Sequence, residues 1–328
     1  MFILSPSIAT HYICYLFHYV ATGHYSYVTH LKLLHKIPKD KFEFQKHKPV
    51  IKGLSTNPLT GELFLADAQN SNVIVLSAME TDARTVIAYR SKKPETPIAV
   101  CFMRTTKTLL ICDYKDIKYK SEAPAEFSLV ALSLVGQQWI EQSRIHLAVA
   151  VAGKGINYFK RLCELEDSEF LFGVENSTTL WRMRVGPTQQ LQMVAEIIVP
   201  DDYYYYDMAA IASNDSIRVA LTLVTQSLVL YSLVGDQLRF LSSVPINNCP
   251  YAYVLWMSER FLVAEKNKET DLFSVWELDL TANRLARRAE LLPEAAGVAL
   301  MRWCTEGLTL TIWDWKFGGI KAFKYIND

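Results

Sequence analysis

The stretch GLSTNPLTGELFLADAQNSNVIVLS, Gly53 to Ser77, divides into three strand-like runs separated by two turns. The first turn contains Asn57, Pro58 and Gly61, and the second runs from Asp67 to Asn72. These residue types favour tight turns because they preset or tolerate unusual backbone angles. The order strand, turn, strand, turn, strand predicts an antiparallel meander.

The same phrase recurs along the whole chain. Segments equivalent to ELFLAD (Glu62 to Asp67) are TLLICD (108–113), EFLFGV (169–174), IRVALTL (217–223), RFLVAE (260–265) and LTLTIWD (308–314). Each precedes another strand-like segment rich in β-branched and aromatic residues. Their starts lie roughly 43 to 48 residues apart, except for one longer interval. Such a period, with four strands per unit, is typical of a β-propeller.

A second recurring element is a hairpin between apolar strands. It reads SLVGQQWIEQSRI, RVGPTQQLQMVAEI, SLVGDQLRFLSSV and DLTANRLARRAEL, with Gly136, Gly186, Gly235 and Asn283 in the turns. Glycine and asparagine tolerate the positive φ that tight hairpins require. After each hairpin a proline-containing connection marks the passage to another strand, because proline cannot donate to a sheet ladder.

These repeats predict an all-β fold, a six-bladed propeller of four-stranded antiparallel blades spanning residues 27–328. The expected blades are 27–79, 84–134, 138–185, 190–234, 237–280 and 283–328, with HLKLLHKI (30–37) as the first strand of the first blade. Residues 1–26 are expected to form a weakly ordered or loosely packed extension, removable at little cost in stability. Alternatively, this extension supplies a strand that closes the ring, or acts as a signal segment.

Composition limits the function classes. The 34 basic residues balance the 34 acidic ones, so no global field favours nucleic acid or an anionic membrane. The six cysteines show no metal-binding spacing and are expected as core thiols in a reducing compartment. We therefore expect a cytoplasmic or nuclear protein without membrane insertion, with secretion as the alternative. The sequence predicts no oligomeric state.

The segment LFLADAQNSNVIVLS (63–77) resembles the blades of NHL and SMP-30-like six-bladed propellers, which often read apolar-x-apolar-Ala-Asp-x-x-Asn before a valine-rich strand. Asp67, Asn70 and Val73 match that pattern, whereas Asn72 replaces the usual basic residue. The resemblance covers one blade. It implies, as an alternative function, a metal-dependent lactonase or esterase.

Such an enzyme would need oxygen ligands around the channel, and carboxylate or amide side chains suit a hard cation. The residues that could supply them lie in connections expected at one rim: Asp201, Asp202, Asp207, Asn247, Asn248 and Glu294. As their equivalents around the ring are chemically unrelated, we expect solvated loop residues there, with no metal, no cofactor and no catalytic residue.

The preferred hypothesis is a non-catalytic scaffold that binds a protein partner through the propeller face with the longer loops. Long loops on a rigid scaffold and exposed aromatic side chains are where binding energy concentrates. The candidate partner-binding residues are Tyr203, Tyr204, Tyr205, Tyr206, Trp313, Trp315, Phe317, Lys92, Lys93, Lys115, Lys118 and Lys120. The basic residues among them also allow a second alternative, a nucleic-acid-associated subunit.

Overall fold

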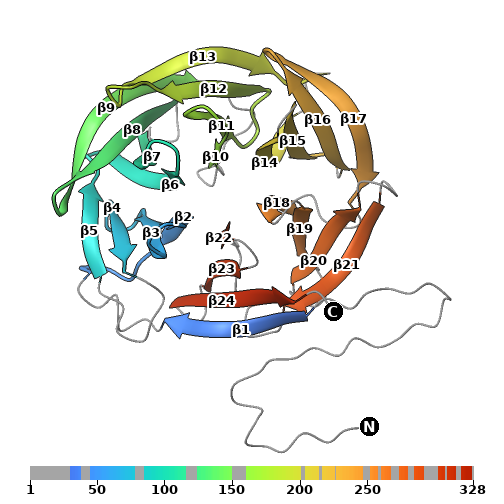
Figure 1. Cartoon of the computed structure of the whole chain (residues 1–328), viewed down its shortest axis with the longest axis horizontal. Helices are drawn as coiled ribbons and strands as arrows, with labels where there is room; N and C mark the ends of the chain where they lie inside the picture. Colours follow the sequence, from blue (N-terminus) through green and yellow to red (C-terminus); the bar gives the residue numbers. More distant parts are fainter. Residues whose placement is uncertain are drawn as a thin grey trace, which may run out of the picture.

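The strands of the computed structural model form sheets arranged around a centre, the β-propeller fold (Figure 1). The structure describes residues 30–37, 45–77, 85–115, 124–149, 160–200, 204–213, 216–225, 227–246, 252–257, 260–266, 273–279, 284–291, 302–306, 309–314 and 319–326. Within these ranges every sheet is four-stranded and antiparallel, and there are six of them. In this part of the chain no helix is long and apolar enough to cross a membrane.

Five sheets are built from four consecutive strands each. Blade 1 contains β2 (Ile51–Asn57), β3 (Glu62–Asp67), β4 (Asn72–Leu76) and β5 (Thr85–Arg90). Blade 2 contains β6 (Glu95–Met103), β7 (Thr108–Lys115), β8 (Ala125–Val135) and β9 (Gln138–Val149). Blade 3 contains β10 (Lys160–Glu164), β11 (Glu169–Val174), β12 (Thr179–Val185) and β13 (Leu191–Ile198). Blade 4 contains β14 (Tyr205–Ser213), β15 (Ser216–Leu223), β16 (Ser227–Val234) and β17 (Gln237–Pro245). Blade 5 contains β18 (Ala252–Met257), β19 (Arg260–Lys266), β20 (Phe273–Asp279) and β21 (Arg284–Leu291).

The sixth sheet joins the two ends of the chain. Its strands are β22 (Arg302–Glu306), β23 (Thr309–Asp314), β24 (Gly319–Ile326) and β1 (His30–Ile37). Strand β1 pairs antiparallel with β24, from His30 opposite Ile326 to Ile37 opposite Ile320. Figure 1 shows β1 on the circumference, beside β24 and between β5 and β21. An N-terminal strand therefore completes the blade formed by the C-terminal strands.

This pairing corrects the predicted blade boundaries. The expected first strand of each unit is instead the outermost strand of the preceding blade, so the predicted units begin one strand early. The repeat period defines the length of a unit but not its starting strand, which depends on the long-range pairing of β1. The extension at 1–26 lies outside the described residues.

A bulge in each outermost strand supports this assignment. The register between the third and outermost strands shifts by one residue in all six described sheets. In β1 the extra residue is Leu34, and in β13 and β17 it is Val194 and Leu241. Strand β1 thus has the same irregularity as the other outermost strands. Bulges of this kind twist a free sheet edge and discourage pairing with other chains.

Side chains between neighbouring blades form the core. Between blades 1 and 2 the rings of Phe64 and Phe102 stack with centroids 5.7 Å apart, and Trp139 meets Phe64 edge-on at 5.6 Å. The inner strands approach closely, since a Cβ on Gly53 would lie 2.8 Å from the Ala99 Cα. Each blade therefore buries its apolar faces only against its neighbours.

Polar contacts also join successive inner strands around the centre. The Ser55 hydroxyl of β2 accepts a hydrogen bond from the Phe102 amide of β6 at 2.9 Å. The Arg161 guanidinium of β10 holds both carboxylate oxygens of Asp207 in β14, at 2.6 and 2.8 Å. The same carboxylate accepts the Val254 amide of β18 at 3.0 Å.

The connections between strands lie on two opposite faces of the propeller, as predicted. Consecutive strands are antiparallel, so every second connection lies on the same face, and the corrected blade boundaries do not change this. The connections from first to second and from third to outermost strand form the tight-turn face, where Gly136 and Gly235 have φ values of 64° and 59°. In the hairpin between β12 and β13 the left-handed residue is Gln189 rather than Gly186. The remaining connections form what we call the long-loop face.

Candidate protein-interaction face

Three segments of blade 1 meet on the long-loop face. They are residues 45–50 before β2, residues 68–71 between β3 and β4, and residues 90–94 at the end of β5. The His47 amide donates to the Asn70 Oδ1, and the Asn70 side-chain amide donates to the His47 carbonyl, both at 2.9 Å. On the other side of the turn, the Ser91 amide donates to the Ser71 carbonyl at 2.9 Å. The turn therefore joins the other two segments.

Asp67, at the end of β3, organises this turn. Its Oδ1 accepts the Val50 amide at 3.0 Å and the Gln69 amide at 3.2 Å, while its Oδ2 accepts the Asn70 side-chain amide at 2.7 Å. The residue is fully buried, and burial raises the pKa of its carboxyl despite these hydrogen bonds. The Asp and Asn of the NHL-like pattern thus have a local structural role here.

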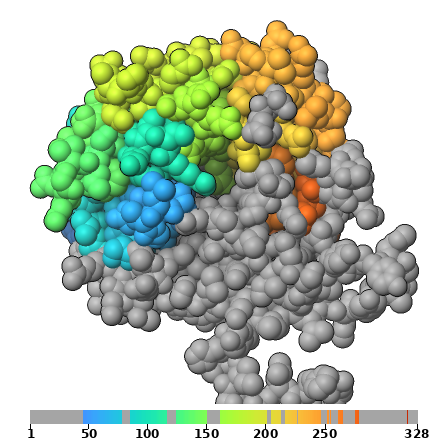
Figure 2. Space-filling model, viewed as in Figure 1, coloured from blue at the N-terminus to red at the C-terminus, as the bar shows by residue number. Residues whose placement is uncertain are grey.

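The three joined segments carry exposed positive charge. Their exposed basic residues are Lys46, His47, Lys48, Arg90, Lys92 and Lys93, and none of their residues is acidic. We call this surface the basic band. Figure 2 shows blade 1 in blue and cyan beside the teal and green of blade 2.

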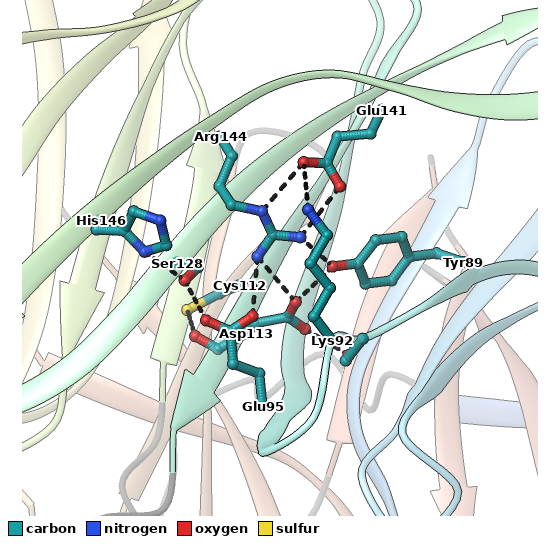
Figure 3. Close-up of polar contacts among 10 residues, drawn as sticks. Tyr89, Lys92, Glu95, Cys112, Asp113, Ser128, Glu141, Arg144 and His146 are labelled. Carbon is teal, nitrogen blue, oxygen red and sulfur yellow. Dashed lines mark hydrogen bonds and ion pairs between the residues drawn. The ribbon is translucent and has the colours of Figure 1, made fainter.

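A polar network between blades 1 and 2 supports that outer end (Figure 3). The Ser91 hydroxyl donates to Asp113 Oδ1 at 2.7 Å, and the Tyr89 hydroxyl donates to Asp113 Oδ2 at 2.5 Å. The Arg144 guanidinium, from β9, donates to Tyr89 Oη at 2.6 Å and to Glu95 Oε2 at 2.9 Å. It also lies 3.6 Å from the Asp113 carboxylate. One guanidinium thus connects β5, β6 and β7.

The same network extends to solvent on both sides. Arg144 donates to Glu141 at 3.1 Å, and the Glu141 carboxylate lies 3.6 Å from the Lys92 ammonium. Farther in, the Ser128 hydroxyl lies 2.6 Å from Glu95 and 2.9 Å from the exposed His146 ring. Ser128 is buried, which makes a nucleophilic role unsuitable despite its histidine neighbour.

Burial raises the pKa of the Asp113 carboxyl, although hydrogen bonds from Tyr89 and Ser91 and the charge of Arg144 oppose the shift. Burial and the Asp113 charge also raise the pKa of Tyr89, so its phenol stays protonated and able to donate. The pKa of the exposed Glu141 is lowered, chiefly by its hydrogen bond with Arg144. The network therefore groups the carboxylates of Asp113, Glu95 and Glu141 around the largely buried Arg144 guanidinium.

The predicted lysines divide between the band and its surroundings. Lys92 and Lys93 lie in the basic band, whereas Lys115 pairs with Glu126 at 2.6 Å at the end of β7. Lys118 and Lys120 lie outside the described residues, as do Trp315 and Phe317. Of Trp313 the structure describes the backbone, within β23 opposite Arg302.

The tyrosine prediction needs correction. Tyr204 is exposed, but Tyr205 and Tyr206 are only 1% and 5% exposed, so these two cannot be surface anchors. Tyr205 lies between blades 3 and 4, where its hydroxyl accepts the Val174 amide at 2.8 Å and donates to the Thr179 carbonyl at 3.0 Å. Tyr206 falls at a register shift between β14 and β15. Because a bulge interrupts the alternation of side chains, adjacent tyrosines are both buried. Tyr203 lies outside the described residues.

The alternative metal site is not assembled from the described residues. Asp207 is buried and its carboxylate is occupied by Arg161 and the Val254 amide. The other proposed ligands, Asp201, Asp202, Asn247, Asn248 and Glu294, lie outside the described ranges. Within those ranges, no three His, Cys, Asp or Glu side chains are grouped to hold a metal ion.

A cavity of about 460 Å³ lies among the inner strands of blades 1 to 5. Its charged lining includes Arg161, which is bound to Asp207, and Glu164, which accepts the Arg104 amide at 2.6 Å. Both side chains thus tie neighbouring blades together, and we assign the cavity walls a structural role.

Sequence reasoning did not identify the network around Arg144. One available signal was the polar run EQSRIH (141–146), which places a carboxylate, a guanidinium and an imidazole within one short segment. The partners on β5, β6 and β7 could not be paired with it, because such contacts require the blade-to-blade arrangement.

No family model and no curated protein matches the sequence. Among solved structures, a chain from the crystal structure of a mitotic checkpoint complex is similar, with a TM-score of 0.52 and 8% sequence identity. The match covers 95% of this chain and 96% of that chain. At this identity the similarity shows the fold, a β-propeller over nearly the full length, and not the function.

Proposed function

We propose that this chain is a six-bladed β-propeller that acts as a non-catalytic scaffold and binds a protein partner through its long-loop face. The observation that carries the proposal is the basic band, where three segments fixed to one another expose positive charge. A preorganised surface binds with less loss of conformational entropy than mobile loops do. That the structurally similar chain comes from a complex is consistent with such a role.

Two finer assignments belong to the same proposal. The NHL-like pattern is confined to blade 1, where Asp67 and Asn70 stabilise a turn, so we place the chain near those propellers in pattern and assign no lactonase activity to it. A reducing compartment, cytoplasmic or nuclear, agrees with the described Cys101, Cys112 and Cys163, which form no disulfide.

Site-specific photo-cross-linking in cells tests the scaffold proposal. A benzophenone amino acid would replace Gln69 or Tyr204 on the long-loop face, and Gln137 or Asp236 on the tight-turn face as matched exposed controls. We expect cross-links to one recurring protein from the long-loop positions. Cross-links formed from the tight-turn positions alone would overturn the assignment of the face.

A further inference from the structure

The basic band concentrates charge in a chain whose overall charge is zero. Its three segments contain four lysines, Lys46, Lys48, Lys92 and Lys93, and one arginine, Arg90, without a carboxylate. Exposed surfaces of folded proteins usually intersperse both signs. The local excess of positive charge therefore points to a ligand of opposite charge.

Among the described residues, the carboxylates nearest to the band have other partners. Asp67 is buried and accepts turn amides, and Asp113 is buried and accepts Tyr89 and Ser91. Glu95 is bound to Arg144 and Ser128 beneath the surface. Glu141 does approach Lys92, but at 3.6 Å and with the lysine side chain 70% exposed, a contact of little energetic weight. Within the described part of the chain, Lys46, Arg90, Lys92 and Lys93 thus keep exposed side chains.

The backbone that carries these cations is fixed on both sides. Asn70 exchanges two hydrogen bonds with His47, the Asn72 side chain donates to Gln45 at 2.9 Å, and the Glu95 amide donates to the Lys92 carbonyl at 2.8 Å. The cations thus lie along a defined path from the inner strand β2 to the outermost strand β5. A flexible anionic chain can follow such a path.

We propose that the basic band binds an anionic segment of a protein partner, one that carries clustered carboxylates or phosphorylated side chains. This inference rests on the scaffold function proposed above. A nucleic acid fits less well, because single strands gain much of their binding energy from bases stacked on exposed aromatic rings. The rings beside the described band are Tyr89, which is buried, and Tyr114, whose ring packs against Phe127 at 5.4 Å.

Fluorescence anisotropy of the full-length protein with three labelled probes of equal length tests the proposal. The probes are an oligoglutamate peptide, a peptide with several phosphoserines, and a single-stranded RNA, each at about 50 mM and 200 mM salt. The test variants are Lys46→Gln/Lys48→Gln and Lys92→Gln/Lys93→Gln. The matched control is Lys107→Gln/Arg239→Gln, which removes two exposed cations outside the band.

We expect at least one peptide to bind in a salt-sensitive manner, each test variant to lose affinity by about fivefold or more, and the control to bind like the wild type. Preference for the phosphopeptide or the oligoglutamate would identify the source of the anionic groups. Equal loss in the control, or RNA binding that exceeds peptide binding and depends on the band, would overturn the inference. If the peptides fail while Gln69 or Tyr204 still cross-links to a protein, the inference fails and the scaffold proposal stands.

Discussion

The Arg144 guanidinium on β9 donates to the phenolic oxygen of Tyr89 on β5 at 2.6 Å, and so joins the outermost strands of two neighbouring blades. The Tyr89 hydroxyl in turn donates a hydrogen bond to the buried Asp113 of β7, so Tyr89 links Arg144 to Asp113. Arg90 and Ser91, the next residues along the chain, begin the outer segment of the basic band. The position of that segment thus depends on a contact between blades.

Replacing Arg144 by methionine should be strongly destabilising. The change removes the only guanidinium of the described network and leaves the buried carboxylate of Asp113 and the partly buried one of Glu95 without their cation. Breaking a buried ion pair from one side costs about 3–5 kcal/mol. Urea unfolding would measure the loss, with Arg239→Met as the exposed control. A loss below about 1 kcal/mol would show that water solvates the network.

Asp113 should make the stability depend on pH. Because burial raises its folded-state pKa above the ordinary 3.8, the folded protein binds its proton more readily than the unfolded chain does. The stabilising effect of that proton is complete below the unfolded pKa and is lost as pH rises from 3.8 through the raised value. Wild type should therefore gain stability relative to Asp113→Asn as pH falls through this window. Denaturant unfolding of both proteins at several pH values would measure this difference in unfolding free energy. A difference that shrinks as pH falls would contradict the prediction.

Tyr205→Phe should lower stability and leave partner binding unchanged. The substitution removes a buried hydroxyl that accepts a hydrogen bond from the Val174 amide and donates one to the Thr179 carbonyl. A buried polar group left without its partner costs about 1–3 kcal/mol. Tyr204→Phe, at an exposed position, should change stability by less than about 0.5 kcal/mol. Thermal unfolding and cross-linking yield separate the two effects. Lost cross-linking with unchanged stability would contradict the structural role of Tyr205.

Gly53→Ala should disturb the contact between blades 1 and 2. The added Cβ would lie 2.8 Å from the Ala99 Cα and 3.0 Å from the Val100 nitrogen. Both are backbone atoms, so no change of side-chain rotamer can relieve the clash. Overpacking of this kind costs about 1–3 kcal/mol. Gly186→Ala is the matched control, since its nearest contact would be an ordinary 3.5 Å. Equal melting temperatures for the two variants would contradict the close approach of β2 and β6.

Deleting β1, residues 30–37, should destabilise the last blade and expose β24. Truncation of residues 1–26 is the comparison, and it is expected to cost less than about 1 kcal/mol because it leaves β1 in place. Size-exclusion chromatography would show association through the exposed edge of β24 in the first variant. A monomeric, equally stable protein without β1 would argue against closure by this strand.

The features that the sequence predicts well are those set by neighbouring residues. The hairpin turns at Gly136 and Gly235 need a left-handed residue, and glycine marks both positions in the sequence. The turn at Asp67 and Asn70 is equally local. Strand order within each meander follows from these turns, and so does the separation of the connections onto two faces.

Features that depend on distant residues could not be predicted in the same way. The pairing of Leu33 with Phe323 has no local signature, so the sequence pattern places the first strand in the wrong blade. Tyr205 and Tyr206 are both buried because a bulge interrupts the alternation of buried and exposed side chains. A run of identical residues gives no sequence signal for the position of a bulge. Besides Glu141 on its own strand, the partners of Arg144 come from β5, β6 and β7, and the contact with β5 depends on blade packing.

Closure by β1 also has a consequence for synthesis. Translation delivers β1 before any other described strand and its partner β24 after all of them. At about 5–20 residues per second, β1 waits on the order of 15 to 60 seconds for the strand it must pair with. Of the described sheets, the one that contains β1 and β24 is therefore the last that synthesis allows to be completed.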